Sequence, residues 1–409
     1  MFDMKNYEYD SKHCRLEIGG ENMVYHCHHY LTNLQRTVFD AEYMDGSGMI
    51  IGCAADATYY QLSNLCKDLS VEDSKLLAQD MYKTFGNGLI DLSAMDENGL
   101  ELSTTKSVIV IAWDILFGKS KKPVDCYTTG YLAAAYAVIY KKELKNINAV
   151  QTQCMSMGAN SNIHIISEGE NNFPTYKKKG EYQFNDTPNP PSSWSGSELL
   201  TSMFKDVHKG LVGNEEGFIP AFGVYLVNNQ SDYVNRIQFE FIKAVESYAG
   251  EYGKTLGGEL LMEAGTACGF FTLGGLIASP EWNQAVKPHL KTKEDWIHAA
   301  VAVTNNMGWG YQVVTEISKD KMVFRNYNDF EDMSYMRMYG NSEDFTHWAN
   351  SGGWYAVMPI IYHSDFIETG EMDQIELYKE VRKSKFGYKI KRTKGISNGD
   401  NYLEVEVAL

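Results

Sequence analysis

Residues 23–35 read MVYHCHHYLTNLQ, and residues 223–238 read GVYLVNNQSDYVNRIQ, far along the same chain. Both open on a short apolar run and pass into a segment whose apolar residues are spaced for helix or strand. The two stretches are the first of several matched pairs. They therefore predict that the chain contains an internal repeat, which decides how the rest of the sequence is divided.

Four further pairs follow in the same order along the chain. Two of them have helical periodicity or an apolar helix after a small-residue turn, one has two strand-like stretches around a tight turn, and one is a closing strand. The pairs are 48–62 with 258–273, 84–107 with 306–329, 128–140 with 351–363, and 158–167 with 399–408. Five matches in a conserved order predict two related halves.

A proline-rich stretch separates the halves. Residues 170–197 read ENNFPTYKKKGEYQFNDTPNPPSSWSGS, a composition that stops both helix and sheet. We expect a first domain over residues 1–170, an irregular linker over 171–215 and a second domain over 216–409. The mixture of helical and strand-like segments predicts an α/β protein, in which the second domain pairs with the first as a fused pseudo-dimer.

Composition excludes several classes of protein. The chain has 409 residues and a formal net charge of -16, which argues against nucleic-acid partners and anionic membrane surfaces. We find no run of about 18 apolar residues, as a membrane span would need, and no apolar signal core at the start. The seven cysteines are scattered, so reduced thiols and a cytoplasmic location are expected.

The stretch from Ser107 to Ile166 resembles the 4-vinyl-reductase domain. The resemblance depends on Cys126, on Gly130-Tyr131-Leu132 at the start of a helix, and on residues 151–158, QTQCMSMG. It weakens upstream toward residue 20, and in the second half only the internal repeat implies it. On this basis the chain is identified as a tandem 4-vinyl-reductase-like protein.

The resemblance implies a fold and a class of ligand. Each domain is expected to be an antiparallel sheet with helices packed on it, related to subunits of vesicle-tethering complexes. Members bind apolar small molecules, either as aromatic-effector sensors in transcription activators or as accessory proteins in chlorophyll-type tetrapyrrole synthesis. The sensors also carry a DNA-binding domain and an ATPase module. This chain has neither, so we expect no regulator role.

The zinc ligands of the family's sensor proteins are only partly present. Cys126 and Cys154 occupy two of the four positions, but Gln151 and Asn162 occupy the others, and His164 fits only by a shifted geometry. Structural zinc prefers four nitrogen or sulfur ligands. Because of these departures from the family pattern we expect no zinc site here, and both cysteines are expected to be small buried residues.

Three of the ten histidines fall within four residues, His26, Cys27, His28 and His29. If the segment is a strand, His26 and His28 share one face and Cys27 and His29 the other. If a helix has begun, His26, His29 and Tyr30 share a face. The matching segment of the second half has aliphatic and amide residues, so the cluster is the leading candidate for chemistry.

The cluster allows three interpretations. His26, His28 and His29 would bind a transition metal such as iron or zinc, because neutral imidazoles suit such ions. Alternatively Cys27, near a helix start, would have a lowered pKa and act as a nucleophile, with the three histidines as catalytic partners. Finally, the four residues would simply line a ligand or the corner between a strand and a helix.

Aromatic side chains near the cluster predict a ligand pocket in the first half. The expected ligand-binding residues are Tyr25, Tyr30, Asp56, Tyr59 and Tyr60, because pockets are mostly apolar with a few fixed polar groups. The leading hypothesis is an enzyme that binds and transforms an apolar or aromatic molecule in a biosynthetic or catabolic pathway. A non-catalytic carrier or sensor is the alternative, an interaction scaffold is the third class, and a homodimer is left open.

Overall fold

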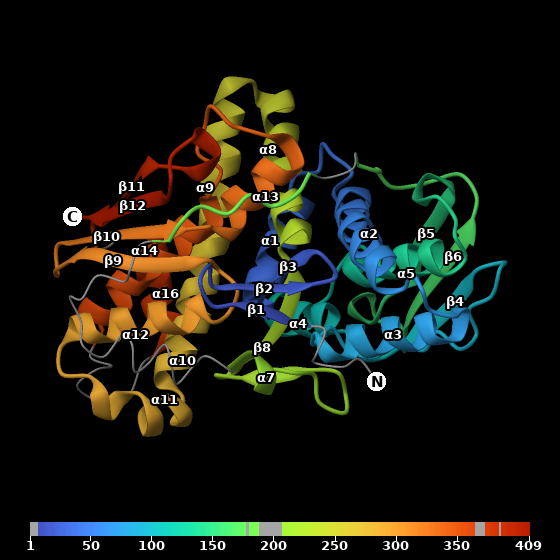
Figure 1. Cartoon of the computed structure of the whole chain (residues 1–409), viewed down its shortest axis with the longest axis horizontal. Helices are drawn as coiled ribbons and strands as arrows, with labels where there is room; N and C mark the ends of the chain where they lie inside the picture. The colour runs from blue at the N-terminus through green and yellow to red at the C-terminus, as the bar shows by residue number, and fades with distance from the viewer. Residues whose placement is uncertain (1–6, 177–179, 188–206, 365–372, 384–385) are drawn as a thin grey trace.

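The structure is a computed structural model that describes residues 7–176, 180–187, 207–364, 373–383 and 386–409. Within these ranges helices and strands mix, and every strand pairing is antiparallel, in three separate sheets (Figure 1). The predicted α/β class is therefore confirmed. Two parts of the predicted linker, 177–179 and 188–206, lie outside the described residues.

A five-stranded sheet at the centre of the molecule contains strands from both halves of the chain. Its order is β1-β2-β3-β8-β7, with bounds Glu8–Asp10, Arg15–Ile18, Glu21–Cys27, Val224–Gln230 and Ile219–Ala221. The middle pair, β3 and β8, contains the two stretches that begin the repeat. They run antiparallel, with Met23 opposite Gln230 and Cys27 opposite Leu226, so one sheet joins the two halves.

The first half continues into a three-stranded sheet, β4-β6-β5, with helices beside it (Figure 1). The strands are Leu100–Thr104, Asn162–Glu168 and Ile147–Gln153. The helices are α1 (His28–Asp40), α2 (Gly46–Leu65), α3 (Val71–Thr84), α4 (Val108–Phe117) and α5 (Cys126–Ile139). Helix α5 approaches α2 closely at Gly130, where an added Cβ would lie 2.3 Å from the Ile51 carbonyl oxygen.

The second half has a four-stranded sheet, β11-β12-β10-β9. Its strands are Lys389–Lys394, Leu403–Ala408, Lys321–Tyr327 and Tyr311–Ile317. The longer helices are α8 (Ser231–Ala249), α9 (Glu251–Cys268), α12 (Lys293–Asn305), α13 (Phe330–Tyr339) and α14 (Trp348–Tyr362). Shorter helices are α7 (Val207–Gly210), α10 (Gly274–Ala278), α11 (Pro280–Ala285) and α16 (Gln374–Arg382).

Each half's first helix packs on the second helix of the other half. Helix α1 lies against α9, and helix α8 lies against α2. This exchange follows from the central sheet, because β3 and β8 run side by side in opposite directions and each leads directly into its helix. The hydrophobic core is consequently continuous across both halves.

The five matched pairs form corresponding elements in the same order, except in the third pair. Residues 306–329 form the hairpin of β9 and β10, whereas in residues 84–107 only the second stretch forms a named strand, β4. The first stretch has left-handed glycines at Gly86 and Gly88, and its Leu92 amide bonds to the Gln79 side chain instead of to a neighbouring strand. The predicted domain boundaries and the pseudo-dimer stay predictions.

Helix α9 continues through a π-helical turn, Gly269–Leu273, into α10. Among the described residues this segment, Glu251–Ala278, is the one helix long and apolar enough to cross a membrane by length and composition. Most of its apolar window, 72%, is buried inside the protein, and buried core helices pass the same test. The feature is weak evidence for a span, and the absence of a membrane partner stays a prediction.

Candidate functional site

The chain changes from strand to helix within the histidine cluster. Strand β3 ends at Cys27 and helix α1 begins at His28, so the side chains of residues 26–29 leave the backbone in different directions. The four residues, which we call the corner, face the second half, including the π-helical turn of Gly269–Leu273. Single π-helical turns occur frequently at functional sites, because they widen a helix locally.

His26 is buried in a box of aromatic rings. Its ring centroid lies 4.2 Å from that of Tyr30, 5.4 Å from Trp309 and 5.5 Å from Phe330. Burial lowers the pKa of His26 to about 3, so the ring is neutral at physiological pH. Neither His26 Nε2 nor the Tyr30 hydroxyl has a hydrogen-bond partner in the described structure.

Cys27 faces a second cysteine from the other half. Its Sγ lies 3.9 Å from Sγ of Cys268, which is the last residue of α9. Burial alone would raise the pKa of the Cys27 thiol, but hydrogen bonds from Cys268, Thr272 and the backbone N–H groups of His29 and Tyr30 outweigh it and lower that pKa. The bond to Cys27 and burial raise the pKa of Cys268 well above its ordinary value. Of the two thiols, Cys27 is therefore the one that loses its proton more readily.

His28 and His29 face away from this pair. Their ring centroids lie 4.2 Å apart, and His29 stacks on Phe271 of the π-helical turn at 4.2 Å. Burial lowers the pKa of His28 to about 4, and burial together with the His28 charge lowers that of His29 to about 3. Nδ1 of His28 accepts a hydrogen bond from the Tyr225 amide over 3.0 Å, which leaves the ring proton on Nε2.

A cavity of about 780 Å³ opens beside these two histidines, between α1, β8 and the segment from α10 to α11. We call it the seam cavity. Its walls are mainly apolar, with a few polar groups from the histidines, Ser279 and Glu281, a balance typical of small-molecule sites. The lining residues are His28, His29, Ile115, Pro220–Tyr225, Gly275 and Ala278–Glu281.

The corner does not fit the predicted three-histidine metal site. The aromatic box encloses His26, while His28 and His29 line the seam cavity. A neutral imidazole has one lone pair, and in His28 the Tyr225 amide already occupies it. In the described parts of the chain, no three histidine, cysteine, aspartate or glutamate side chains are arranged to hold a metal ion. A bound iron or zinc ion stays a prediction that this arrangement does not favour.

A second cavity, of about 620 Å³, lies along one face of helix α2. We call it the α2 cavity. Three of the predicted ligand-binding residues, Asp56, Tyr59 and Tyr60, line it at helical spacing. The remaining lining residues come from the same helix, from the loop before β5 and from the linker, namely Gly52, Ala55, Ser63, Asn64, Glu143–Lys145, Phe173–Tyr176 and Glu181.

The floor and wall of the α2 cavity are firmly held. Asp56 pairs with the guanidinium of Arg236 on α8, whose Nη2 lies 3.1 Å from the carboxylate, and this guanidinium also covers the Tyr176 ring at 4.3 Å. The linker wall approaches the helix backbone at Gly52, where an added Cβ would lie 2.4 Å from the Pro174 carbonyl oxygen. The absence of a side chain at Gly52 thus allows the wall to close.

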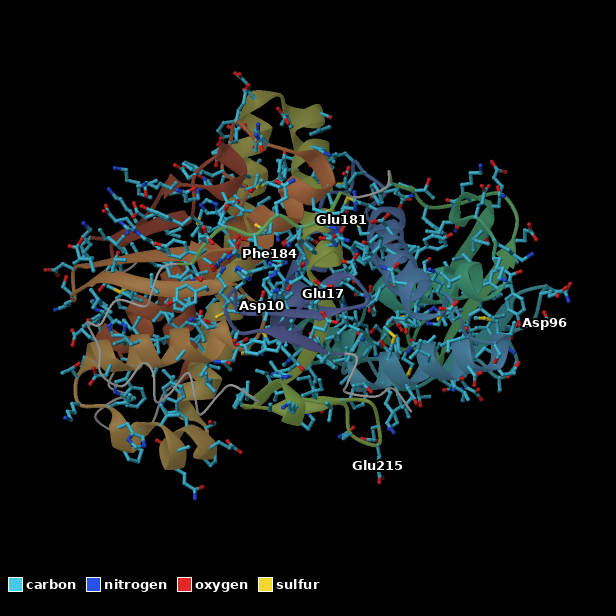
Figure 2. The ribbon with its side chains drawn as sticks, viewed as in Figure 1. Asp10, Glu17, Asp96, Glu181, Phe184 and Glu215 are labelled. Atoms are coloured by element: carbon cyan, nitrogen blue, oxygen red, sulfur yellow. The ribbon has the colours of Figure 1, made fainter. Side chains whose placement is uncertain are left out.

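One end of the α2 cavity is fixed by alternating aromatic and arginine side chains. The Arg337 guanidinium lies 4.6 Å from the Tyr60 ring centroid and 4.3 Å from that of Tyr182. Arg15 lies between Tyr182, at 4.8 Å, and Phe184, at 5.7 Å. Figure 2 labels Glu181 and Phe184 along this part of the linker, beside the central-sheet strands with Asp10 and Glu17. Although irregular, residues 180–187 are therefore held against the protein.

Two predicted ligand-binding residues lie elsewhere. Tyr25 is on β3 and donates hydrogen bonds to the carbonyl oxygens of His208 and Leu211, and Tyr30 packs on His26. Neither residue lines the α2 cavity. The structure therefore groups Asp56, Tyr59 and Tyr60 at one cavity and places Tyr25 and Tyr30 outside it, and ligand binding by the five residues stays a prediction.

Several residues of these sites carry no local sequence signal. Arg236, Tyr176, Phe271 and Cys268 reach them only through contacts between distant segments. Cys268 was visible as one of seven scattered cysteines, but its spacing from Cys27 gives no motif. The aromatic residues of the linker were the best sequence signal that this segment packs against the protein, since flexible linkers are usually rich in small residues.

The residues of the partial zinc motif bond to one another and to the backbone. The Gln151 side chain accepts a hydrogen bond from the Asp125 amide over 2.9 Å and donates one to Asn162 over 3.3 Å. Cys126 and Cys154 are both buried. The two amides thus link the start of α5 to β5 and β6, and the expected absence of zinc at these positions stays a prediction.

Three buried carboxyl groups at the start of α13 form another cluster of titratable groups. Glu331 accepts the backbone N–H groups of Ala349 and Asn350 at the start of α14. Burial and the nearby charge of Asp332 raise the pKa of Asp329 to about 7, and burial with Asp329 raises that of Glu331 well above its ordinary value. These contacts are to helix ends and amides, so the cluster organises the second half internally.

No family model matches the chain, and no curated protein sequence matches it. Among solved structures, the phenol-responsive sensory domain of the transcription activator PoxR, crystallised with phenol, is similar over 53% of this chain and 90% of that domain, at 10% sequence identity and a TM-score of 0.38. A similarity at this level assigns neither a family nor a ligand to the chain.

Proposed function

We propose that the chain binds a small, flat, aromatic or otherwise apolar molecule in the α2 cavity. The observation that supports this function is the grouping of Tyr59, Tyr60 and Phe173 around a cavity that is also lined by Asp56, whose carboxylate is held by Arg236. Rings offer stacking surface, and a fixed carboxylate orients a hydroxyl or amino group of the ligand. A carrier or sensor needs no more than this arrangement.

The test is binding of a panel of monocyclic phenols, anilines and indoles to the full chain by isothermal titration and thermal shift. Tyr59→Ala should weaken the affinity for a binding compound by about tenfold, or about 1.4 kcal/mol. Tyr252→Ala is the matched control, because Tyr252 is an exposed tyrosine, 73% accessible, on α9. Binding unaffected by Tyr59→Ala, or no binding by any compound, would refute the proposal.

Chemical transformation of a ligand is the second candidate function, at the seam cavity. The neutral rings of His28 and His29 line that cavity, and the Tyr225 amide fixes the tautomer of His28 as a donor through Nε2. Such a neutral ring can donate a hydrogen bond to a bound molecule and so stabilise negative charge that develops on it during a reaction. For a compound that the panel identifies, turnover lost in His28→Gln, with binding retained, supports an enzyme. Unchanged turnover removes His28 from the reaction.

A further inference from the structure

Cys27 and Cys268 are 241 positions apart in the sequence, yet their sulfur atoms lie 3.9 Å from each other in the core. All seven cysteines lie within the described residues, and each of them is a buried free thiol. Cys27 and Cys268 are the pair for which the structure places one sulfur against another. By contrast, Cys53 contacts the Tyr176 hydroxyl and Cys14 contacts the Ser11 carbonyl oxygen.

The surroundings of the pair suit thiol chemistry. Cys27 is at the N-terminal end of α1, whose positive dipole end stabilises a thiolate. Cys268 has Thr272 Oγ1 at 3.8 Å and His26 Nδ1 at 3.9 Å, so polar atoms surround both sulfurs. Cys268 is also followed directly by the π-helical turn, where the backbone departs from regular α-helical bonding.

We infer that Cys27 and Cys268 form a redox centre that a peroxide converts into a disulfide between the two halves. The Cys27 thiolate attacks one peroxide oxygen, the O–O bond breaks, and a sulfenic acid forms while the other oxygen leaves as water after taking up a proton. Cys268 sulfur, having lost its proton, then attacks the Cys27 sulfur. The S–O bond breaks and a second water leaves. In total, two thiols and one hydrogen peroxide give one disulfide and two waters.

Closing the bond requires the sulfurs to approach from 3.9 Å to about 2.05 Å. The π-helical turn next to Cys268 gives that cysteine a local place to shift without breaking all of α9. The bond would tie α1 to α9, which pack together although they belong to different halves. Since the closed loop is long, the oxidised chain should be the more stable form.

The experiment treats the reduced full chain with hydrogen peroxide, alkylates the remaining thiols under denaturing conditions, and measures the intact mass. The expected product carries alkyl groups on all but two cysteines, and a non-reducing digest contains one peptide pair joined through Cys27 and Cys268. Dithiothreitol should restore full alkylation and lower the melting temperature. Cys66→Ser is the control, because Cys66 is buried and should still allow the cross-link.

Two variants separate the steps. In Cys268→Ala, peroxide should leave Cys27 as a sulfenic acid that a dimedone probe labels, whereas Cys27→Ser should give neither the label at this site nor the cross-link. Folding of each variant is checked by circular dichroism, and wild-type mapping alone decides the outcome if a variant fails to fold. Full alkylation after peroxide treatment, or a disulfide between other cysteines, would overturn the inference. Ligand binding in the α2 cavity is measured on the reduced chain, so the two proposals fail independently.

Discussion

The Gln230 side-chain amide donates a hydrogen bond to the Gln61 side-chain carbonyl over 2.9 Å. Gln230 is the last residue of β8, directly before α8, and Cys27 is the last residue of β3, directly before α1. Each of the two side chains contacts the second helix of the opposite half. Gln230 bonds to Gln61 of α2, and Cys27 contacts Cys268 of α9. The last strand residue before the first helix thus takes part in an amide pair in one half and in a thiol pair in the other.

The amide pair should contribute measurably to stability. Gln61→Ala removes its bonds to Gln230 and to the Ile18 carbonyl in a fully buried place. Buried groups left without partners cost about 1–3 kcal/mol each, so we expect the free energy of unfolding to fall by about 3 kcal/mol. Urea denaturation measures the change. Asn64→Ala, which removes an exposed bond from the same helix to Gly19, should change it by less than about 0.5 kcal/mol.

Gly52 should control access to the α2 cavity. In Gly52→Ala the new methyl group meets the Pro174 carbonyl oxygen, so the linker wall must move and ligand affinity should fall by about tenfold. Gly257→Ala on α9 is the matched control, because the nearest atom there lies 3.5 Å from the added carbon, an ordinary contact. Isothermal titration of a binding compound compares the two. Equal affinity in both variants would show that the wall does not shape the cavity.

His26 should make the protein sensitive to acid. Its folded pKa of about 3 lies below the unfolded value of about 6.5, so the unfolded state takes up the proton first as pH falls. The stabilising contribution is complete above pH 6.5 and is lost as pH falls toward 3. At pH 4 the loss of free energy of unfolding amounts to about 3 kcal/mol. His26→Phe keeps a ring in the aromatic box, so its free energy of unfolding should decline less between pH 7 and 4. A decline equal to that of wild type would contradict this.

Asp329 should have the opposite effect. Its folded pKa of about 7 exceeds the ordinary carboxyl value near 3.9, so the folded state holds the proton longer. This contribution is complete below pH 3.9 and is lost as pH rises through 7. Asp329→Asn keeps a capping side chain at the start of α13 but cannot ionise. Between pH 4 and 7 its free energy of unfolding should therefore rise relative to wild type, measured by urea denaturation at each pH.

The matched segments could be recognised because the spacing of their apolar residues is a local property of the sequence. The match between residues 23–35 and 223–238 was visible from local apolar spacing, and both stretches run from a strand into a helix, although the spacing left helix and strand open there. Likewise Asp56, Tyr59 and Tyr60 share a helix face, and spacing along α2 placed them in one cavity. Local patterns of this kind can be read from the sequence because they do not depend on contacts with distant segments.

The composition of each site could not be predicted in the same way. The position where β3 becomes α1 decides that His26 enters an aromatic box while His28 and His29 line the seam cavity, and the sequence left that position open. The partners Cys268 and Arg236 come from the other half, and they meet their sites only through the exchange of helix packing. A single sequence holds no direct record of such contacts.

The exchange of packing has a consequence for how the protein can be divided. A fragment ending at residue 176 would keep α1 and α2 but lose α9 and α8, the helices that cover them. Strand β3 would also lose β8 and become an edge, with its hydrogen-bonding groups open to another chain. Two such fragments could cover each other's surfaces by the same geometry. Produced without the second half, this fragment should therefore self-associate instead of forming an independent monomer.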